Sequence, residues 1–171
     1  MEELDQIFRE ATGSVDEPYF RLPIDGGDPV YRERVYCYEL YHQMRSRWPE
    51  NCPFWLNGEI DKGGHPLLRA KGADYAKPDF LIHTPGDMDG NHAIIEVKSE
   101  KAAPSEIWQD LRKLSQFVTD IGYARAIYLI YGYRSDHKAE QIARMMQSSE
   151  QLAPIELWVH AGPGDEAVQK I

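Results

Sequence analysis

The sequence predicts an α/β protein, a single domain over residues 1–171 with a mixed central β-sheet flanked by helices. Two apolar patterns carry this prediction. Short apolar segments separated by turn residues follow one another across residues 54–98, which is typical of antiparallel strands. A helix-spaced apolar pattern over residues 105–121 then leads into a continuous apolar run at 126–131, as expected for a crossover helix and a buried strand.

The N-terminal part of the chain is expected to end in a long helix. Residues 1–27 predict an extension made of a short helix and an irregular segment rich in proline and glycine. Asp28 and Pro29 are typical of a helix start, so a helix is expected from there to about Trp48. Its predicted apolar face consists of aromatic and aliphatic side chains and one thiol: Tyr36, Cys37, Leu40, Tyr41, Met44 and Trp48.

Three strands are expected after this helix, at residues 54–60, 80–83 and 93–98. The turn-rich sequence of residues 84–91 predicts that the last two strands form a hairpin. The segment between the first two, residues 61–77, is predicted to be a loop. The long helix, these three strands, the helix at 105–121 and the buried strand at 126–131 give the order α-β-β-β-α-β.

The second half of the chain follows a helix–strand alternation. The helix at 105–121 is expected to end at Gly122, before the strand at 126–131. A further helix at 137–147 and a strand at 155–160 complete the pattern. The predicted organisation is therefore an extension (1–27), a core (28–132) and a C-terminal helix and strand (133–171).

Composition excludes several classes of function. The apolar runs are too short to span a bilayer and the N-terminus is acidic, so we expect a cytoplasmic protein without a membrane partner. Neither Cys37 nor Cys52 lies in a zinc-binding pattern. The net charge of -9 argues against a protein that coats nucleic acid through basic residues. It leaves room for an enzyme whose central carboxylates are neutralised by bound cations.

The residues that carry chemistry lie on the predicted hairpin. Residues two apart on a strand point to the same side, so Glu96 and Lys98 share a face. Antiparallel pairing brings Asp79, at the start of the preceding strand, within reach of both. Two carboxylates can hold Mg²⁺ or Mn²⁺ through oxygen ligands, and a lysine can position an attacking water or stabilise developing negative charge.

Two further carboxylates are candidates for the same site. Glu33 falls on the apolar face of the long helix, where a carboxylate is costly to bury without a partner. A metal site is one such partner and a buried arginine is another, while an acidic residue in a first helical turn needs neither. Glu39 falls off the apolar face. Glu59, at the end of the first strand, is a candidate for the rim of the site.

With these residues in place, the chain resembles the PD-(D/E)xK nuclease superfamily over roughly residues 30–132. The resemblance is carried by Pro78 and Asp79, by the Glu96-Val97-Lys98 segment and by Glu33. It implies a restriction-endonuclease-like fold and a small stand-alone member that hydrolyses phosphodiester bonds, in DNA by preference. It also implies that Asp79, Glu96 and the backbone carbonyl of Val97 bind metal while Lys98 acts on the water. The segment from Asp110 to Leu114 is similar to one found in some small members.

One departure from the family concerns the helix after the hairpin. Some members carry a Gln-x-x-x-Tyr motif there, whereas Gln109 is followed four residues later by Lys113, so that subgroup is not supported. The basic residues Lys62, Arg69 and Lys71 of the 61–77 loop, with Lys77 at its end, form one candidate phosphate-contacting patch. Arg112 and Lys113 form a weaker one.

Several alternatives stay open at the level of the sequence. The motif residues could be a solvated strand end with an ordinary Glu–Lys pair. The domain could be a non-catalytic binding or regulatory subunit of a larger nucleic-acid-processing or defence assembly. RNA or branched DNA could replace linear DNA as the substrate, and a homodimer or a protein partner is compatible with the sequence.

Overall fold

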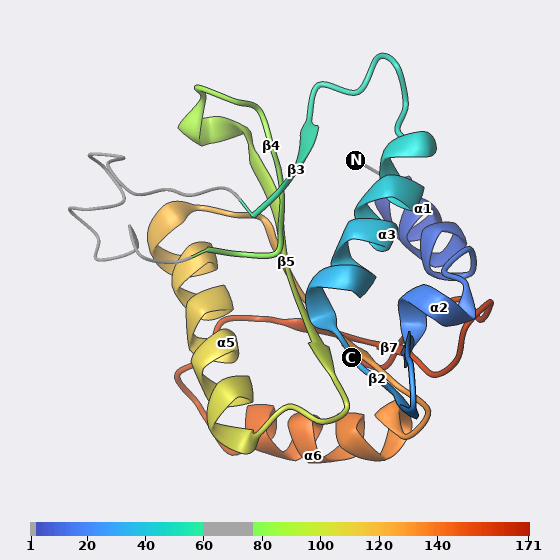
Figure 1. Ribbon diagram of the computed structural model, residues 1–171. Coiled ribbons are helices and arrows are strands. Elements are labelled where there is room, and N and C mark those ends of the chain that lie inside the picture. The colour runs from blue at the N-terminus through green and yellow to red at the C-terminus, as the bar shows by residue number, and fades with distance from the viewer. Residues whose placement is uncertain (1–2, 60–76) are drawn as a thin grey trace.

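The computed structural model describes residues 3–59 and 77–171 and contains a six-stranded mixed sheet (Figure 1). The strands lie in the order β3-β4-β5-β6-β7-β8, and their bounds are Trp55–Gly58, Phe80–His83, Asn91–Ser99, Arg125–Tyr131, Glu156–His160 and Val168–Gln169. The first three strands pair antiparallel, β5, β6 and β7 pair parallel, and β8 returns antiparallel to β7. The predicted mixed sheet and the predicted hairpin are confirmed.

Helices cover both faces of this sheet (Figure 1). The helical elements are α1 (Leu4–Thr12), α2 (Glu17–Phe20), α3 (Glu33–Ser46), the short turn η1 (Met88–Gly90), α5 (Pro104–Gln116), the π-helical turn η2 (Phe117–Ile121) and α6 (Ser135–Gln147). The first three pack on one face and α5 and α6 on the other. Gly122 follows η2 with φ 89°, so it ends the helix as the sequence predicts.

Alternation along the strands divides the core into two clusters. On β5, Ile95 and Val97 face the cluster that includes Tyr36, Leu40 and Met44 of α3. Ile94 faces the other cluster, with α5 and α6. Each such side chain stabilises the fold by about 1.5–3 kcal/mol when it is fully buried. The sheet is held between these clusters, so the side chains of β5 point alternately toward α3 and toward α5.

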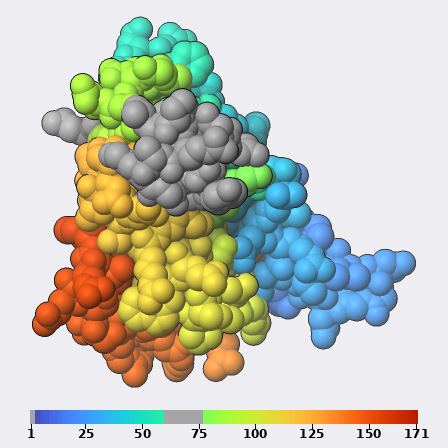
Figure 2. All heavy atoms as spheres, turned by 90° about the vertical axis from the view of Figure 1, so that its left-hand side faces the viewer, coloured from blue at the N-terminus to red at the C-terminus, as the bar shows by residue number. Residues whose placement is uncertain are grey.

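The expected helix start at Asp28 and Pro29 is wrong. Residues before α3 form a two-stranded hairpin, β1 (Leu22–Ile24) and β2 (Gly27–Val30), and Asp28 and Pro29 lie within β2. Arg21 Nη2 donates a hydrogen bond to the carbonyl of Pro29 at 2.6 Å, and proline is tolerated in an edge strand that needs no donor there. The hairpin (blue) projects to one side of the body in Figure 2.

The long helix is accordingly shorter than expected at both ends. It begins at Glu33 and ends at Ser46, and Trp48 lies beyond it, where its indole Nε1 donates to the carbonyl of Phe54 at 2.9 Å. The expected apolar face is confirmed for Tyr36, Cys37, Leu40 and Met44, which are buried, whereas Tyr41 and Trp48 are only partly buried against the same cluster. No helix within residues 3–59 and 77–171 is both long enough and apolar enough to cross a membrane.

The sheet opens on one side of β5. Strand β4 pairs with β5 from His83 opposite Asn91 to Phe80 opposite Ile95, and this is where β4 begins. The remainder of β5, Glu96 to Ser99, continues alongside β6. In the described parts of the chain, this half of β5 therefore has a strand neighbour on one side and an opening on the other.

Candidate functional site

Asp79 occupies the opening, one residue before β4. Its Oδ2 accepts a hydrogen bond from the backbone N–H of Val97 at 2.7 Å. Its own backbone carbonyl accepts from the N–H of Glu59 at 3.0 Å. The Asp79 carboxylate therefore takes the place of the next strand partner of β5, and both contacts fix where it lies.

This contact also orients the Val97 backbone. In an antiparallel ladder a hydrogen-bonded residue directs both its N–H and its C=O to the same neighbouring strand. Since the N–H of Val97 meets Asp79, its carbonyl faces the same opening. The side chain of Val97 packs in the α3-side core, so its backbone is what it presents to the site.

Glu96 is the most deeply buried charged residue of the site, with 1% of its surface exposed. Its Oε1 accepts a hydrogen bond from Lys113 Nζ of α5 at 2.8 Å. Lys113 Nζ also lies 3.1 Å from Asp110 Oδ1, one helical turn back. The structure thus brings Asp110 and Lys113 of α5, from the Asp110–Leu114 segment that the sequence singled out, into contact with the site.

Lys98 links the two faces of the sheet. Its Nζ donates to Glu33 Oε2 of α3 at 2.9 Å and lies 3.7 Å from Asp110 Oδ2 of α5. Its side chain is 19% exposed and that of Glu33 is 38% exposed. Helix α3 begins at Glu33, which puts this carboxylate at the opening beside β5. The four residues expected to form the site, Glu33, Asp79, Glu96 and Lys98, are brought together.

Burial and like charge raise the pKa of both central carboxyl groups. Burial raises the pKa of Asp79 to about 6, against the hydrogen bond from Val97 and the positive charge of Lys98. Burial, and then the charge of Asp79, raises the pKa of Glu96 to about 8, against Lys113. Both groups therefore lose their protons at a higher pH than ordinary carboxyl groups do, Asp79 just below neutral pH and Glu96 just above it.

The lysines keep their protons. Burial alone would lower the pKa of Lys98, but Asp110 and Glu33 outweigh it and hold the pKa above its ordinary value. Glu96 and Asp110 raise the pKa of Lys113 against burial in the same way. Four carboxyl groups and two ammonium groups thus share the site, which leaves two negative charges in excess when all are ionised.

This charge excess fits a divalent cation. Carboxylate and carbonyl oxygens are the donors that Mg²⁺ and Mn²⁺ prefer, and the site offers Asp79, Glu96 and the Val97 carbonyl. Within residues 3–59 and 77–171, no group of three or more His, Cys, Asp and Glu side chains is arranged so as to hold a metal ion. Asp79 and Glu96 supply only two such side chains, and the third oxygen beside them is the backbone carbonyl of Val97.

The remaining candidates lie apart or at the rim. Glu59 pairs with Arg34 at 3.1 Å through its side chain, and only its backbone contacts Asp79. Glu39 accepts from Gln43 on α3, in line with its place off the apolar face. Of the predicted phosphate-contacting loop, Lys77 is exposed. The other basic residues of that loop, Lys62, Arg69 and Lys71, lie outside the described residues.

Asp110 and Lys113 carry a signal in the sequence. Asp110 falls within the apolar stripe of α5, between Ile107 and Leu114, where a carboxylate is costly to bury alone. The same argument selected Glu33 on the other helix. Arg112, which the sequence grouped with Lys113, lies instead on the outer side of α5 over the Trp108 ring at 5.9 Å.

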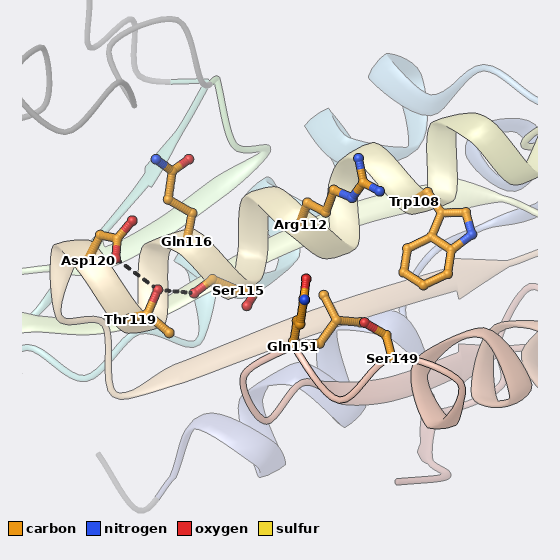
Figure 3. Close-up of a pocket in the computed structure, with 9 residues that line it drawn as sticks. Trp108, Arg112, Ser115, Gln116, Thr119, Asp120, Ser149 and Gln151 are labelled. Atoms are coloured by element: carbon orange, nitrogen blue, oxygen red, sulfur yellow. Dashed lines mark hydrogen bonds between the residues drawn. The ribbon is translucent and has the colours of Figure 1, made fainter.

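A cavity of about 340 Å³ lies on that outer side of α5 (Figure 3). It is lined by residues of α5, of η2 and of the segment before β7: Trp108, Arg112, Ser115, Gln116, Thr119, Asp120, Ser149, Gln151 and Leu152. This lining includes neither Asp110 nor Lys113. The cavity is therefore a separate surface from the carboxylate–lysine site.

Comparisons with protein-family profiles, with curated proteins and with solved structures give no match to this chain.

Proposed function

We propose that the chain is a metal-dependent nuclease that hydrolyses phosphodiester bonds, with DNA as the preferred substrate. The observation that carries the proposal is the Asp79–Val97 hydrogen bond at the opening of the sheet. It sets a carboxylate and a backbone carbonyl beside Glu96 and Lys98. The excess negative charge of the site supports Mg²⁺ or Mn²⁺ as the cofactor.

Each residue of the site has a distinct role in this proposal. Asp79 and Glu96 bind the cation, together with the Val97 carbonyl. When bound, the cation supplies an activated water and neutralises charge on the scissile phosphate. Glu33 and Asp110 hold the Lys98 ammonium at 2.9 and 3.7 Å, so that it can act on the attacking water or on developing negative charge. Hydrolysis is direct and needs no covalent intermediate.

The test is a cleavage assay with Mg²⁺ and Mn²⁺ on linear, circular, single-stranded and branched DNA and on RNA. We expect Lys98→Ala to abolish cleavage and to leave the fold intact. Lys170→Ala is the matched control, because Lys170 lies next to β8 at the other edge of the sheet and pairs with Asp136. Cleavage by purified Lys98→Ala at the wild-type rate would show that the assignment is wrong.

A second candidate function is a non-catalytic binding or regulatory subunit of a larger nucleic-acid-processing or defence assembly. The contact that favours it is the 2.8 Å ion pair in which the Lys113 ammonium occupies Glu96, as a bound cation would. Calorimetry with Mn²⁺ separates the two candidates. Absence of binding at millimolar Mn²⁺ favours the subunit, and binding that Asp79→Asn removes favours the nuclease.

A further inference from the structure

Lys113 holds two carboxylates at once. Its Nζ lies 2.8 Å from Glu96 Oε1 and 3.1 Å from Asp110 Oδ1. Its side chain is 23% exposed, so part of it reaches solvent. An ammonium group has three donors, so it can keep one partner while it leaves the other.

Asp110 has acceptor capacity to spare. It is 6% exposed, and its Oδ2 has no hydrogen-bond partner among the described residues, although Lys98 Nζ lies 3.7 Å away. A buried carboxylate oxygen without a hydrogen bond is unusual, because the loss of hydration there is uncompensated. Asp110 can therefore accept a further hydrogen bond without any change of backbone.

We propose that the Lys113 ammonium and a divalent cation compete for Glu96 in the candidate site, and that Asp110 accepts the displaced ammonium. Lys113 neutralises Glu96 while no divalent cation is bound, and Asp110 takes over the ammonium when one binds. This inference rests on the proposed metal-dependent nuclease. Lys113 and Asp110 are positioning residues in it, since they act through Glu96.

The geometry makes this transfer short. Lys113 and Asp110 lie three residues apart on the same helix and are already paired, so rotation of the lysine side chain suffices. A divalent cation on Glu96 repels the ammonium, and the attraction of Asp110 keeps it in the site. The consequence is a lower affinity for metal than the carboxylates alone would give, because each binding event displaces a resident charge.

The experiment measures Mn²⁺ affinity by calorimetry at pH 8 on full-length protein freed of metal with a chelator. Lys113→Met removes the competing charge and keeps the length of the side chain, and we expect about tenfold tighter binding, in the range of coupling between contacting residues. Asp110→Asn leaves Lys113 on Glu96, and we expect about tenfold weaker binding. Lys170→Met is the matched control and should bind as wild type does.

The double variant Lys113→Met/Asp110→Asn separates the proposed transfer of the ammonium from a simple effect of charge. If Asp110 acts by receiving Lys113, Asp110→Asn has no effect on Mn²⁺ affinity in the Lys113→Met background. If Asp110 only adds negative charge, the tenfold loss persists there, and the proposal is overturned. Equal or weaker binding by folded Lys113→Met overturns it as well.

Two further outcomes distinguish this inference from the proposed function. If Lys113→Met does not fold, Asp110→Asn still decides, because it keeps the Lys113–Glu96 pair, and unchanged affinity would overturn the inference. Wild-type protein that binds no Mn²⁺ overturns the proposed function and the inference together. Wild-type binding without the expected changes in the variants overturns the inference alone.

Discussion

The two halves of β5 differ although they belong to one strand. From Ala93 to Ile95 the strand pairs with both β4 and β6, and its buried side chains are aliphatic. From Glu96 onward β5 no longer pairs with β4, and this part of the strand carries Glu96 and Lys98. Burial does not separate the halves, since Ile95 and Glu96 are exposed by 0% and 1%. What separates them, in the part of the chain that the structure describes, is the lack of a strand neighbour on the β4 side of the second half, where charged side chains from α3, from α5 and from the residue before β4 meet.

The largest effect on stability is expected from a substitution in the aliphatic half of β5. Ile95→Ala should lower the free energy of unfolding by about 2–5 kcal/mol, because it leaves a cavity in the α3-side core. Denaturant unfolding measures this loss. Mn²⁺ affinity of the folded fraction should stay unchanged, and a parallel loss of affinity would mean that the two halves are not independent.

The charged half should respond in activity rather than in stability. Lys98→Ala is expected to reduce cleavage by at least about 10²–10³-fold, the effect of removing one preorganised donor from a reacting site. Thermal unfolding should change much less than in Ile95→Ala. Lys98→Arg tests the geometry, because a guanidinium keeps the charge but does not fit the same contacts with Glu33 and Asp110. Full activity of Lys98→Arg would contradict a positioned ammonium.

The pH should act on the charged half through its two central carboxyl groups. The pKa of Asp79 rises from 3.8 to about 6 on folding and that of Glu96 from 4.5 to about 8. These two carboxyl groups bind more protons in the folded state, so they lower stability as the pH rises from about 4 to about 8. Burial lowers the pKa of His92 and of His160 to about 4, which raises stability up to about pH 6.5, so the metal-free protein should show its net loss of stability from about pH 6.5 to about pH 8. Melting temperatures measured from about pH 4 to about pH 8 give this dependence. Asp79→Asn should remove the loss of stability that Asp79 contributes between about pH 4 and about pH 6, and a pH dependence identical to that of the wild type would contradict the burial of this carboxylate.

Metal binding should show the opposite trend. Because the carboxylates must lose their protons to bind a cation, Mn²⁺ affinity should rise from pH 6 to pH 8 with release of protons. Calorimetry in buffers of different ionisation enthalpy counts these protons. Binding without proton release would place the cation elsewhere.

The smallest effect is expected at the rim. Glu59→Gln removes an exposed ion pair with Arg34 and should change stability by less than about 1 kcal/mol. Cleavage should stay within about twofold of wild type, because the backbone N–H of Glu59, and not its side chain, contacts Asp79. A large loss of cleavage would move Glu59 from the rim into the site.

The sequence predicted those elements whose apolar spacing fits only one kind of secondary structure. The hairpin, the crossover helix and the buried strand follow from alternation and helical spacing, and the shared face of Glu96 and Lys98 follows with them. The helix start was wrong because an Asp-Pro pair suits an edge strand as well as a first turn. The sequence singled out the segment of α5 that holds Asp110 and Lys113 but not their contacts, because their partners Lys98 and Glu96 lie on β5, which helical spacing alone does not reveal.

The hydrogen bond between Asp79 and Val97 gives the site its own internal reporter. The amide proton of Val97 is held by a carboxylate rather than by a strand carbonyl. Its chemical shift and its exchange with solvent therefore depend on how that carboxylate is charged and shared. A ligand drawn to the Asp79 oxygens changes the signal of a single backbone amide, which can be followed by NMR without any label on the ligand.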